Sequence, residues 1–223
     1  FWVHEFPAVY QAISLGLRDQ AFELMRVGLD VHDTTPSGDR ALTLAVRLGD
    51  AEAVRYLLWF GANVEDVGRE NQRPLGVATL RRSQEVLPEL LMGGADPNQS
   101  FITPVQPELI DALPIKDLKY WLRIDTGVTP LMACAARGDV EAAALLMRHG
   151  AKPSLCTKKN KRYPINFAAT QGYLFLMRVL LGRSPDEEPA LLVTVDLSQQ
   201  KAWITKQGKV IDFVAAADAR IAV

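Results

Sequence analysis

Few residues of this 223-residue chain could carry covalent chemistry or bind a metal. It has two cysteines, Cys134 and Cys156, and three histidines. Cys134 lies among small apolar residues, which is typical of a buried thiol. Two cysteines without a histidine cluster do not favour a zinc site. His149 precedes a glycine at a predicted helix end, where it would cap the last carbonyls. We therefore expect no catalytic residue, no metal and no cofactor in this chain.

The densest cluster of charge is the run Lys158-Lys159-Asn160-Lys161-Arg162, which falls in a predicted turn. One interpretation is an ordinary solvated turn. The other is a site where Lys158, Lys159, Lys161 and Arg162 hold an acidic partner or a phosphate by their charge. The chain has no glycine-rich phosphate-binding loop.

The elements that must position these residues repeat along the chain. Glycines close four similar segments, at Gly28, Gly61, Gly94 and Gly150. The first three are 33 residues apart, and the fourth follows after 56, which is one period plus a 23-residue insertion. A fixed period of this length is typical of a solenoid, in which each unit buries its apolar face by stacking on its neighbours.

The segment from residue 129 to 151 shows most clearly how one unit is built. Thr129 is a good helix N-cap, and Pro130 suits the first helical position. Gly138 ends this first helix because it tolerates a positive φ. The periodicity of the second helix predicts an apolar stripe on Val140, Ala144, Leu145 and Leu146. We therefore expect Leu145 to lie in the core.

This pattern resembles the ankyrin repeat, whose consensus includes Thr-Pro-Leu-His-x-Ala-Ala, a glycine, Leu-Leu and Gly-Ala-Asp-x-Asn. Residues 1–183 contain five aligned copies, which begin near Pro7, Arg40, Arg73, Thr129 and Tyr163. The resemblance implies a mainly α fold, an ankyrin-repeat solenoid of about five helix pairs. The family's histidine is replaced in every copy, by Tyr10, Thr43, Gly76, Met132 and Asn166. The hydrogen bonds that it makes must therefore be lost or replaced.

The third copy departs most from the pattern. Arg82 stands where the inter-helix glycine is expected, and Pro88 falls inside the second helix. We expect that helix to start near Leu87 or to kink there. A helical insertion follows at residues 99–125, in which Tyr120 and Trp121 add apolar bulk. Two interpretations remain open: the insertion covers the gap beside the short helix, or it is a binding loop on the concave side.

The ankyrin resemblance implies a protein–protein interaction scaffold that binds a polypeptide partner on its concave face. Positions before the inter-helix glycine, together with two aromatic residues of the insertion, predict the contact residues. They are Leu15, Arg47, Leu48, Leu80, Arg81, Arg137, Tyr120 and Trp121. Arginine and aromatic residues are frequent in binding hot spots. The alternative is a set of solvated residues, or of residues packed against the insertion.

The helical period stops near residue 184. Residues 184–189 are rich in proline and acidic residues and indicate a linker. Residues 190–223 then alternate as in short antiparallel strands, with a last strand near 219–223. We expect this β-rich segment to begin a second, incomplete domain. The alternative is a small β cap on the solenoid.

Residues 193–203, with Gly208-Lys209-Val210, are similar to the opening strands of the L,D-transpeptidase catalytic domain. That resemblance implies a bacterial cell-wall enzyme in which a cysteine thiolate attacks a peptide carbonyl. None of that family's catalytic motifs occurs in this sequence. We therefore expect the chain to be a fragment, the targeting region of such a protein. The alternative is a stand-alone binding or inhibitor protein.

Composition narrows the possible partners. The formal net charge of −1 gives no overall attraction to nucleic acid or anionic membranes. No apolar run approaches the 18 residues of a membrane span. We expect a monomer with a protein partner. The transpeptidase resemblance implies the bacterial cell envelope or periplasm, and a stand-alone scaffold leaves the cytoplasm open.

Overall fold

A computed structural model describes residues 6–182, 192–196, 201–206 and 209–211 of the chain. It divides into two compact units. Unit 1 consists of Phe1–Asp96 and Phe101–Pro114, and unit 2 of Pro97–Ser100 and Ile115–Val223. The chain therefore leaves unit 1 after Asp96, just before the predicted insertion, returns to it at Phe101 and leaves it again after Pro114.

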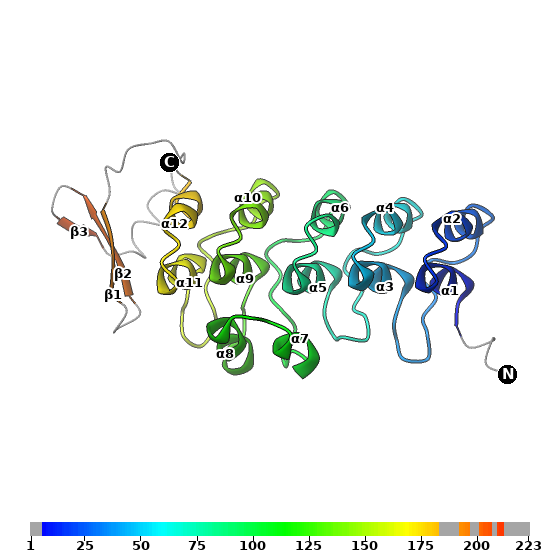
Figure 1. Cartoon of the computed structure of the whole chain (residues 1–223), viewed down its shortest axis with the longest axis horizontal. Coiled ribbons are helices and arrows are strands. Elements are labelled where there is room, and N and C mark those ends of the chain that lie inside the picture. The colour runs from blue at the N-terminus through cyan, green and yellow to red at the C-terminus, as the bar shows by residue number, and fades with distance from the viewer. Residues whose placement is uncertain (1–5, 183–191, 197–200, 207–208, 212–223) are drawn as a thin grey trace. The chain divides into compact units, whose positions relative to one another are not determined.

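Where the structure describes it, from residue 6 onward, unit 1 contains three helix pairs and one further short helix. They are α1 (Ala8–Ser14) with α2 (Arg18–Arg26), α3 (Ala41–Leu48) with α4 (Ala51–Trp59), α5 (Pro74–Arg81) with α6 (Val86–Met92), and α7 (Pro107–Asp111). The first helices α1, α3 and α5 form one layer, and α2, α4 and α6 form a second (Figure 1). The loops that join one pair to the next project from the first-helix side.

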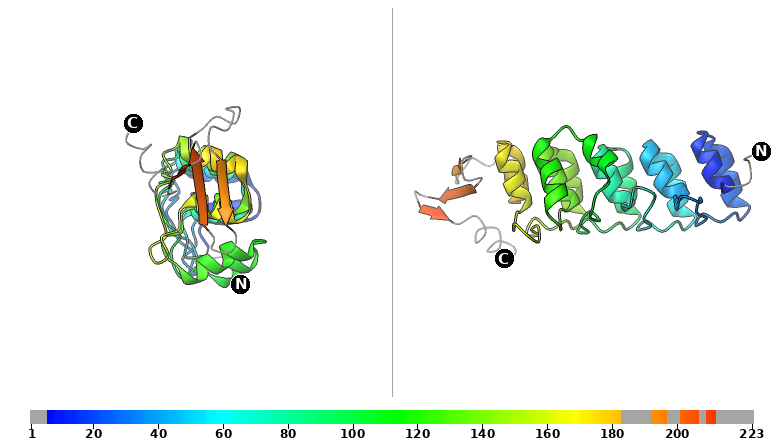
Figure 2. Two further views of the ribbon diagram at one scale, coloured as in Figure 1. Left: turned by 90° about the vertical axis from the view of Figure 1, so that its left-hand side faces the viewer. Right: turned by 90° about the horizontal axis from the view of Figure 1, so that it is seen from below.

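The described residues of unit 2 form two helix pairs, one helix of the insertion and three strands. They are α8 (Lys116–Ile124), α9 (Pro130–Arg137) with α10 (Val140–Arg148), α11 (Pro164–Thr170) with α12 (Leu174–Leu180), β1 (Leu192–Asp196), β2 (Lys201–Lys206) and β3 (Lys209–Ile211). Seen from below, the paired helices within each unit lie side by side at a similar tilt (Figure 2). The predicted helix pairs and the helical insertion are confirmed.

The three strands pair antiparallel in the order β1-β2-β3, with Thr194 opposite Trp203. The predicted linker at 184–189 and the predicted last strand at 219–223 lie outside the described residues. The proposal of a second domain over residues 190–223 therefore stays a prediction.

Local signals account for the helix ends. Asp50 caps α4 by accepting a hydrogen bond from the Ala53 amide at 3.0 Å. Gly49 ends α3 in the left-handed region at φ 74°. Arg82 ends α5 in the same conformation at φ 57°, so the third copy keeps the turn without its glycine. Helix α6 begins at Val86, which places Pro88 in the first turn, where no intrahelical donor is lost.

The core of each unit lies between its first and second helices. The largest fully buried side chains include Leu42, Leu57 and Leu90 of unit 1 and Leu146, Phe167 and Leu176 of unit 2. The predicted stripe of α10 needs correction, because Ala142, Ala143 and Leu146 are its buried residues and Leu145 is only half-buried. The sequence leaves the phase of this stripe ambiguous because apolar residues occupy six consecutive positions, 142–147.

At three of the five positions where the family's histidine is missing, the structure shows what takes its place. Thr43 Oγ1 accepts a hydrogen bond from the Arg40 amide at 3.1 Å. Asn166 Oδ1 accepts one from the Tyr163 amide at 2.8 Å, which closes the start of α11 in the same way. At Gly76 an added Cβ would lie 3.2 Å from the Phe101 ring, so the insertion occupies that space.

The insertion is shared between the two units. In unit 1, the Gln72 side chain donates to the Ile102 carbonyl at 2.6 Å and accepts from its amide at 3.0 Å. Figure 1 shows α7 on the side of α5 that faces away from α6. The idea that the insertion fills a gap beside the short second helix is therefore wrong for this half, which contacts the first-helix side.

Candidate functional site

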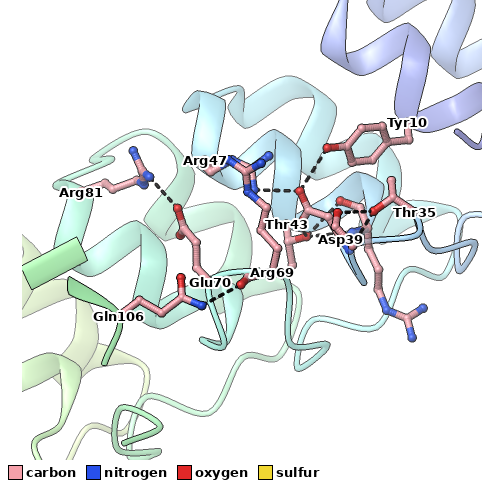
Figure 3. A network of polar contacts seen from close by, with 11 residues as sticks. Tyr10, Thr35, Asp39, Thr43, Arg47, Arg69, Glu70, Arg81 and Gln106 are labelled. Atoms are coloured by element: carbon pink, nitrogen blue, oxygen red, sulfur yellow. Dashed lines mark hydrogen bonds and ion pairs between the residues drawn. The ribbon is translucent and has the colours of Figure 1, made fainter. Parts of the chain in front are cut away.

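A buried ion pair organises the first-helix side of unit 1. The Asp39 side chain is fully buried, and the Arg47 side chain is 11 % exposed. Arg47 Nη1 lies 2.8 Å from Asp39 Oδ2. Thr43 Oγ1 and the Tyr10 hydroxyl donate to the same carboxylate at 2.6 and 3.1 Å (Figure 3). One carboxylate thus joins α1 and α3 to the loop that precedes α3.

The environment of Asp39 favours its charged form. Burial alone would raise the pKa of this carboxyl, but hydrogen bonds from Thr43, Arg47 and Tyr10 outweigh it and lower the pKa below 3.8. Burial and the Asp39 charge raise the pKa of Tyr10, so its hydroxyl remains a donor. Arg47, predicted as a contact residue, is therefore first of all the partner of a buried charge.

The other predicted residues of unit 1 differ in their exposure. Leu15 is 71 % exposed and Leu48 is 56 % exposed, at equivalent ends of α1 and α3. Arg81 pairs with Glu70 at 2.6 Å, and its side chain is 40 % exposed. Leu80 is 5 % exposed and faces the core, so its assignment to the surface needs correction. Leu15, Leu48 and Arg81 remain as candidates for contact with a partner.

In unit 2 the structure brings several predicted residues together. The Arg162 guanidinium lies over the Trp121 ring, 4.2 Å from its centroid. Trp121 also meets Phe167 and Tyr120 edge-on, with centroid distances of 6.3 and 5.1 Å. Tyr120 is 56 % exposed. The aromatic pair of the insertion and the end of the basic turn therefore form one contiguous cluster.

Arg137, the remaining predicted contact residue, is half-buried at the end of α9. Its Nη2 lies 4.0 Å from the Cys134 Sγ within the same helix. Cys134 is buried, as expected, and Cys156 is half-buried. Neither cysteine forms a disulfide within the described part of the chain.

The basic turn is built around Asp125, which is only 2 % exposed. Its carboxylate accepts hydrogen bonds from the Lys159 amide at 2.9 Å and from the Asn160 amide and side chain at 3.0 Å each. The Thr157 amide donates to the Arg162 carbonyl at 2.9 Å, which closes the loop. One more residue is enclosed here than in the corresponding loop Thr35–Asp39, as the sequence predicted.

The pKa of Asp125 gives a testable measure of this arrangement. Burial would raise it, but the hydrogen bonds from the Lys159 amide, Thr157 and Asn160 lower it from 3.8 to about 2. Because the pKa of Asp125 is lower in the folded than in the unfolded state, its ionised carboxylate stabilises the fold. This stabilisation is complete above the unfolded pKa and is lost as the pH falls toward 2.

We expect Asp125→Asn to lower the free energy of unfolding by roughly 2 kcal/mol at pH 7. The difference from the wild type should close between about pH 4 and pH 2, as the wild-type carboxylate is protonated. Urea denaturation at a series of pH values measures it. Glu141→Gln, at an exposed position in the first turn of α10, is the control and should change stability by less than about 0.5 kcal/mol. A pH-independent difference would contradict this account.

Other kinds of site find no support in the described part of the chain. Among the residues that the structure describes, no three His, Cys, Asp or Glu side chains are grouped as they would be around a metal ion. No helix in this part of the chain has the length and apolarity needed to cross a bilayer.

Comparison with known families agrees with the repeated helix pairs. A family model for ankyrin repeats in three copies matches residues 9–100. A model for a single ankyrin repeat matches residues 126–158. Together the two matches span more than half of the chain. The chain is an ankyrin-repeat protein. The fifth helix pair, α11 and α12, and residues 101–125 of the insertion lie outside both matches.

A curated relative extends the comparison. Cyclin-dependent kinase 4 inhibitor B of Mus musculus is 27 % identical to this ankyrin-repeat protein over 150 residues. The alignment covers 67 % of this chain and 97 % of the relative. Ankyrin repeats are protein–protein interaction scaffolds, so the described units form a scaffold of that kind.

Two carboxylates that organise these surfaces were missed by the sequence analysis. Asp39 lies in the loop before α3, in the same repeat as Arg47. The presence of these two opposite charges in one repeat is the signal that could have indicated the ion pair. Asp125 opens an Asp-Thr-Gly sequence before the fourth copy. Its partners lie in the next loop, 34 and 35 residues away, so only the alignment of the repeats could have suggested it.

Proposed function

We propose that this ankyrin-repeat protein binds a polypeptide partner on the first-helix face of unit 1, with Leu15 and Leu48 as its apolar contacts. The observation that carries the proposal is the exposure of these two leucines, 71 % and 56 %, at equivalent repeat positions. Helices α1 and α3 pack on each other, so the two side chains belong to neighbouring elements of one unit. Large exposed apolar side chains on a rigid face favour association with a partner.

The framework beneath this face supports the proposal. The Asp39–Arg47 pair joins α3 to its preceding loop, and Tyr10 adds α1 to the same network. Such a framework holds the face in one geometry and reduces the ordering cost of binding. Arg81 and Glu70, which are more exposed, would lie at the polar rim, where charge tunes association rates more than affinity.

A photo-crosslinking residue placed at Leu48 of the full chain tests the proposal. We expect it to yield a covalent adduct with a polypeptide partner in cells that express the protein. The matched control carries the same residue at Arg55 on α4 of the outer layer, where the native side chain is 59 % exposed. Leu15→Gln should reduce the Leu48 adduct severalfold. Equal adducts from both positions, or none from Leu48, would overturn the assignment.

A second candidate function is inhibition of a protein kinase. The curated relative is named as an inhibitor of cyclin-dependent kinase 4, and the alignment covers nearly its whole length. The purified chain at stoichiometric concentration should then suppress phosphate transfer by a cyclin-dependent kinase. Unchanged kinase activity at a tenfold molar excess would remove this candidate and leave the scaffold proposal intact.

The transpeptidase resemblance stays a prediction. It rests on residues 193–210, of which the described strands show only the backbone pairing. The cell-envelope location and the monomeric state also stay predictions. The coding sequence that follows residue 223 is the observation that tests the transpeptidase prediction, since the catalytic cysteine motif would have to occur there.

A further inference from the structure

We infer that unit 2 carries a second docking surface, formed by Lys158, Lys159 and Lys161 beside Tyr120, and that it takes an acidic segment of a partner polypeptide. This surface is separate from the leucines of unit 1, so the inference goes beyond the function proposed above. It rests on three observations: a turn with a fixed backbone, lysines without carboxylate partners, and an exposed aromatic ring in the same cluster.

The backbone of the basic turn is held in place from two directions. Asp125 accepts the amides of Lys159 and Asn160, and the Lys158 amide donates to the Thr126 carbonyl at 2.8 Å. The chain at Gly127 lies so close that an added Cβ would be 3.2 Å from Lys158 Cγ. The lysine side chains therefore project from a preorganised loop, which lowers the entropy cost of binding a ligand.

The three lysines of the turn form no ion pair with another described residue. The side chains of Lys158, Lys159 and Lys161 are exposed. Among the described residues, no carboxylate lies within ion-pair distance of their ammonium groups. The Asp125 carboxylate, around which the turn is built, is buried and directs its oxygens to the backbone amides. Three positive charges thus face solvent on one short turn.

The aromatic neighbour distinguishes this surface from a simple solvated turn. Trp121 contacts both the Arg162 guanidinium, at the end of the turn, and the ring of Tyr120. Burial lowers the pKa of Arg162, in keeping with a guanidinium that is stacked and partly removed from water. Trp121 therefore links the exposed ring of Tyr120 to Arg162, the last residue of the basic turn. A cation cluster beside an aromatic ring fits a segment that carries carboxylates and an apolar residue.

Charge favours a polypeptide over a nucleic acid as the occupant. Nucleic-acid-binding domains commonly carry a basic face and a pI above 9. This chain has a formal net charge of −1 and a sequence pI near 6.4. Three lysines on one turn match a few carboxylates and not an extended phosphate backbone.

Fluorescence polarisation with the full chain tests the inference. The probe is a fluorescein-labelled peptide of eight residues, six glutamates followed by phenylalanine and glycine. At low salt we expect saturable binding that weakens as salt rises. The triple variant Lys158→Gln, Lys159→Gln, Lys161→Gln should bind about tenfold more weakly, because each of three exposed ion pairs contributes a factor of about two to the affinity.

Three matched measurements make the result specific. A triple variant Arg69→Gln, Arg82→Gln, Lys152→Gln removes the same charge at exposed positions elsewhere and should keep at least half of the affinity. Tyr120→Ser should weaken the phenylalanine peptide but not an all-glutamate peptide. Leu15→Gln with Leu48→Gln should leave peptide binding unchanged, so failure of the unit 1 proposal is distinguishable from failure of this one.

Several outcomes would overturn the inference. They are equal losses in the two triple variants, no binding at 1 mM peptide, or tighter binding of the wild type to a 20-base-pair DNA duplex or to phosphatidylserine vesicles than to the peptide. Circular dichroism of each variant checks that the helices are retained, so that lost binding is read only from folded protein.

Discussion

Arg47→Ala should lower the free energy of unfolding by about 3 to 5 kcal/mol at pH 7, since it leaves the Asp39 carboxylate buried without its cationic partner. Asp39 is fully buried, and Arg47 is its ion-pair partner among the described residues. Thr43 and Tyr10 would still donate hydrogen bonds, but neither compensates the charge. Urea denaturation followed by circular dichroism measures the loss.

The pH dependence and a matched variant show whether the buried charge is the cause. The folded pKa of Asp39 is depressed, so its stabilisation is present above its unfolded pKa and is lost as the pH falls. In Arg47→Ala the buried Asp39 carboxylate can lose its charge by taking up a proton. The difference in free energy of unfolding from the wild type should therefore shrink as the pH falls from 7 through about 4. Arg81→Ala removes a pair that is more exposed, and it should cost no more than about 1 kcal/mol. Equal losses in the two variants would contradict this interpretation.

Leu146→Ala should destabilise the fold by about 2 to 5 kcal/mol, because it leaves a cavity between α10 and its neighbours. Leu146 is fully buried and belongs to the face of α10 that packs on α9 and α12. Small residues surround it on the same face, Ala142 and Ala143, and they cannot extend into the space. The midpoint of thermal unfolding measures the effect.

Leu145→Ala is the matched control, since it changes the same residue type one position away in the same helix. Leu145 is half-buried, so its loss should cost clearly less than that of Leu146. A larger loss at Leu145 would show that the predicted stripe, and not the observed one, faces the core.

The repeat could be read from the sequence because its signals are local. Gly138, Thr129 and Pro130 each specify a turn, a cap or a first helical position through their own backbone preferences. Thr129 indeed accepts from the Met132 amide, and Gly138 takes φ 71°. The same period explains why the third copy could be aligned although Arg82 replaces its glycine. An arginine can adopt the left-handed conformation that the turn needs, at some cost in strain.

The contacts between repeats could not be read in this way. The last residue of the loop before the first helix is Asp39 in the second copy, Gln72 in the third and Arg162 in the fifth. Asp39 binds an arginine of its own repeat, Gln72 binds the backbone of Ile102, and Arg162 stacks on Trp121. One position thus has three partners, and two of them lie in an insertion that has no counterpart in the other copies. Residue type alone does not choose among such partners, because packing and burial decide them.

The division of the insertion between units has a consequence for synthesis on the ribosome. Unit 1 is not complete at Asp96, since Phe101 and Ile102 must still return to Gly76 and Gln72. When Phe101 and Ile102 have been synthesised, Asn98 of unit 2 is already part of the chain. Its partners, the Gly150 carbonyl and the Lys152 amide, follow more than 50 residues later. Domains usually fold in turn as they emerge, N-terminal first. Here a segment of unit 2, Pro97–Ser100, precedes the last segment of unit 1 in the sequence. The nascent chain must therefore complete the folding of unit 1 while this segment of unit 2 still lacks its partners.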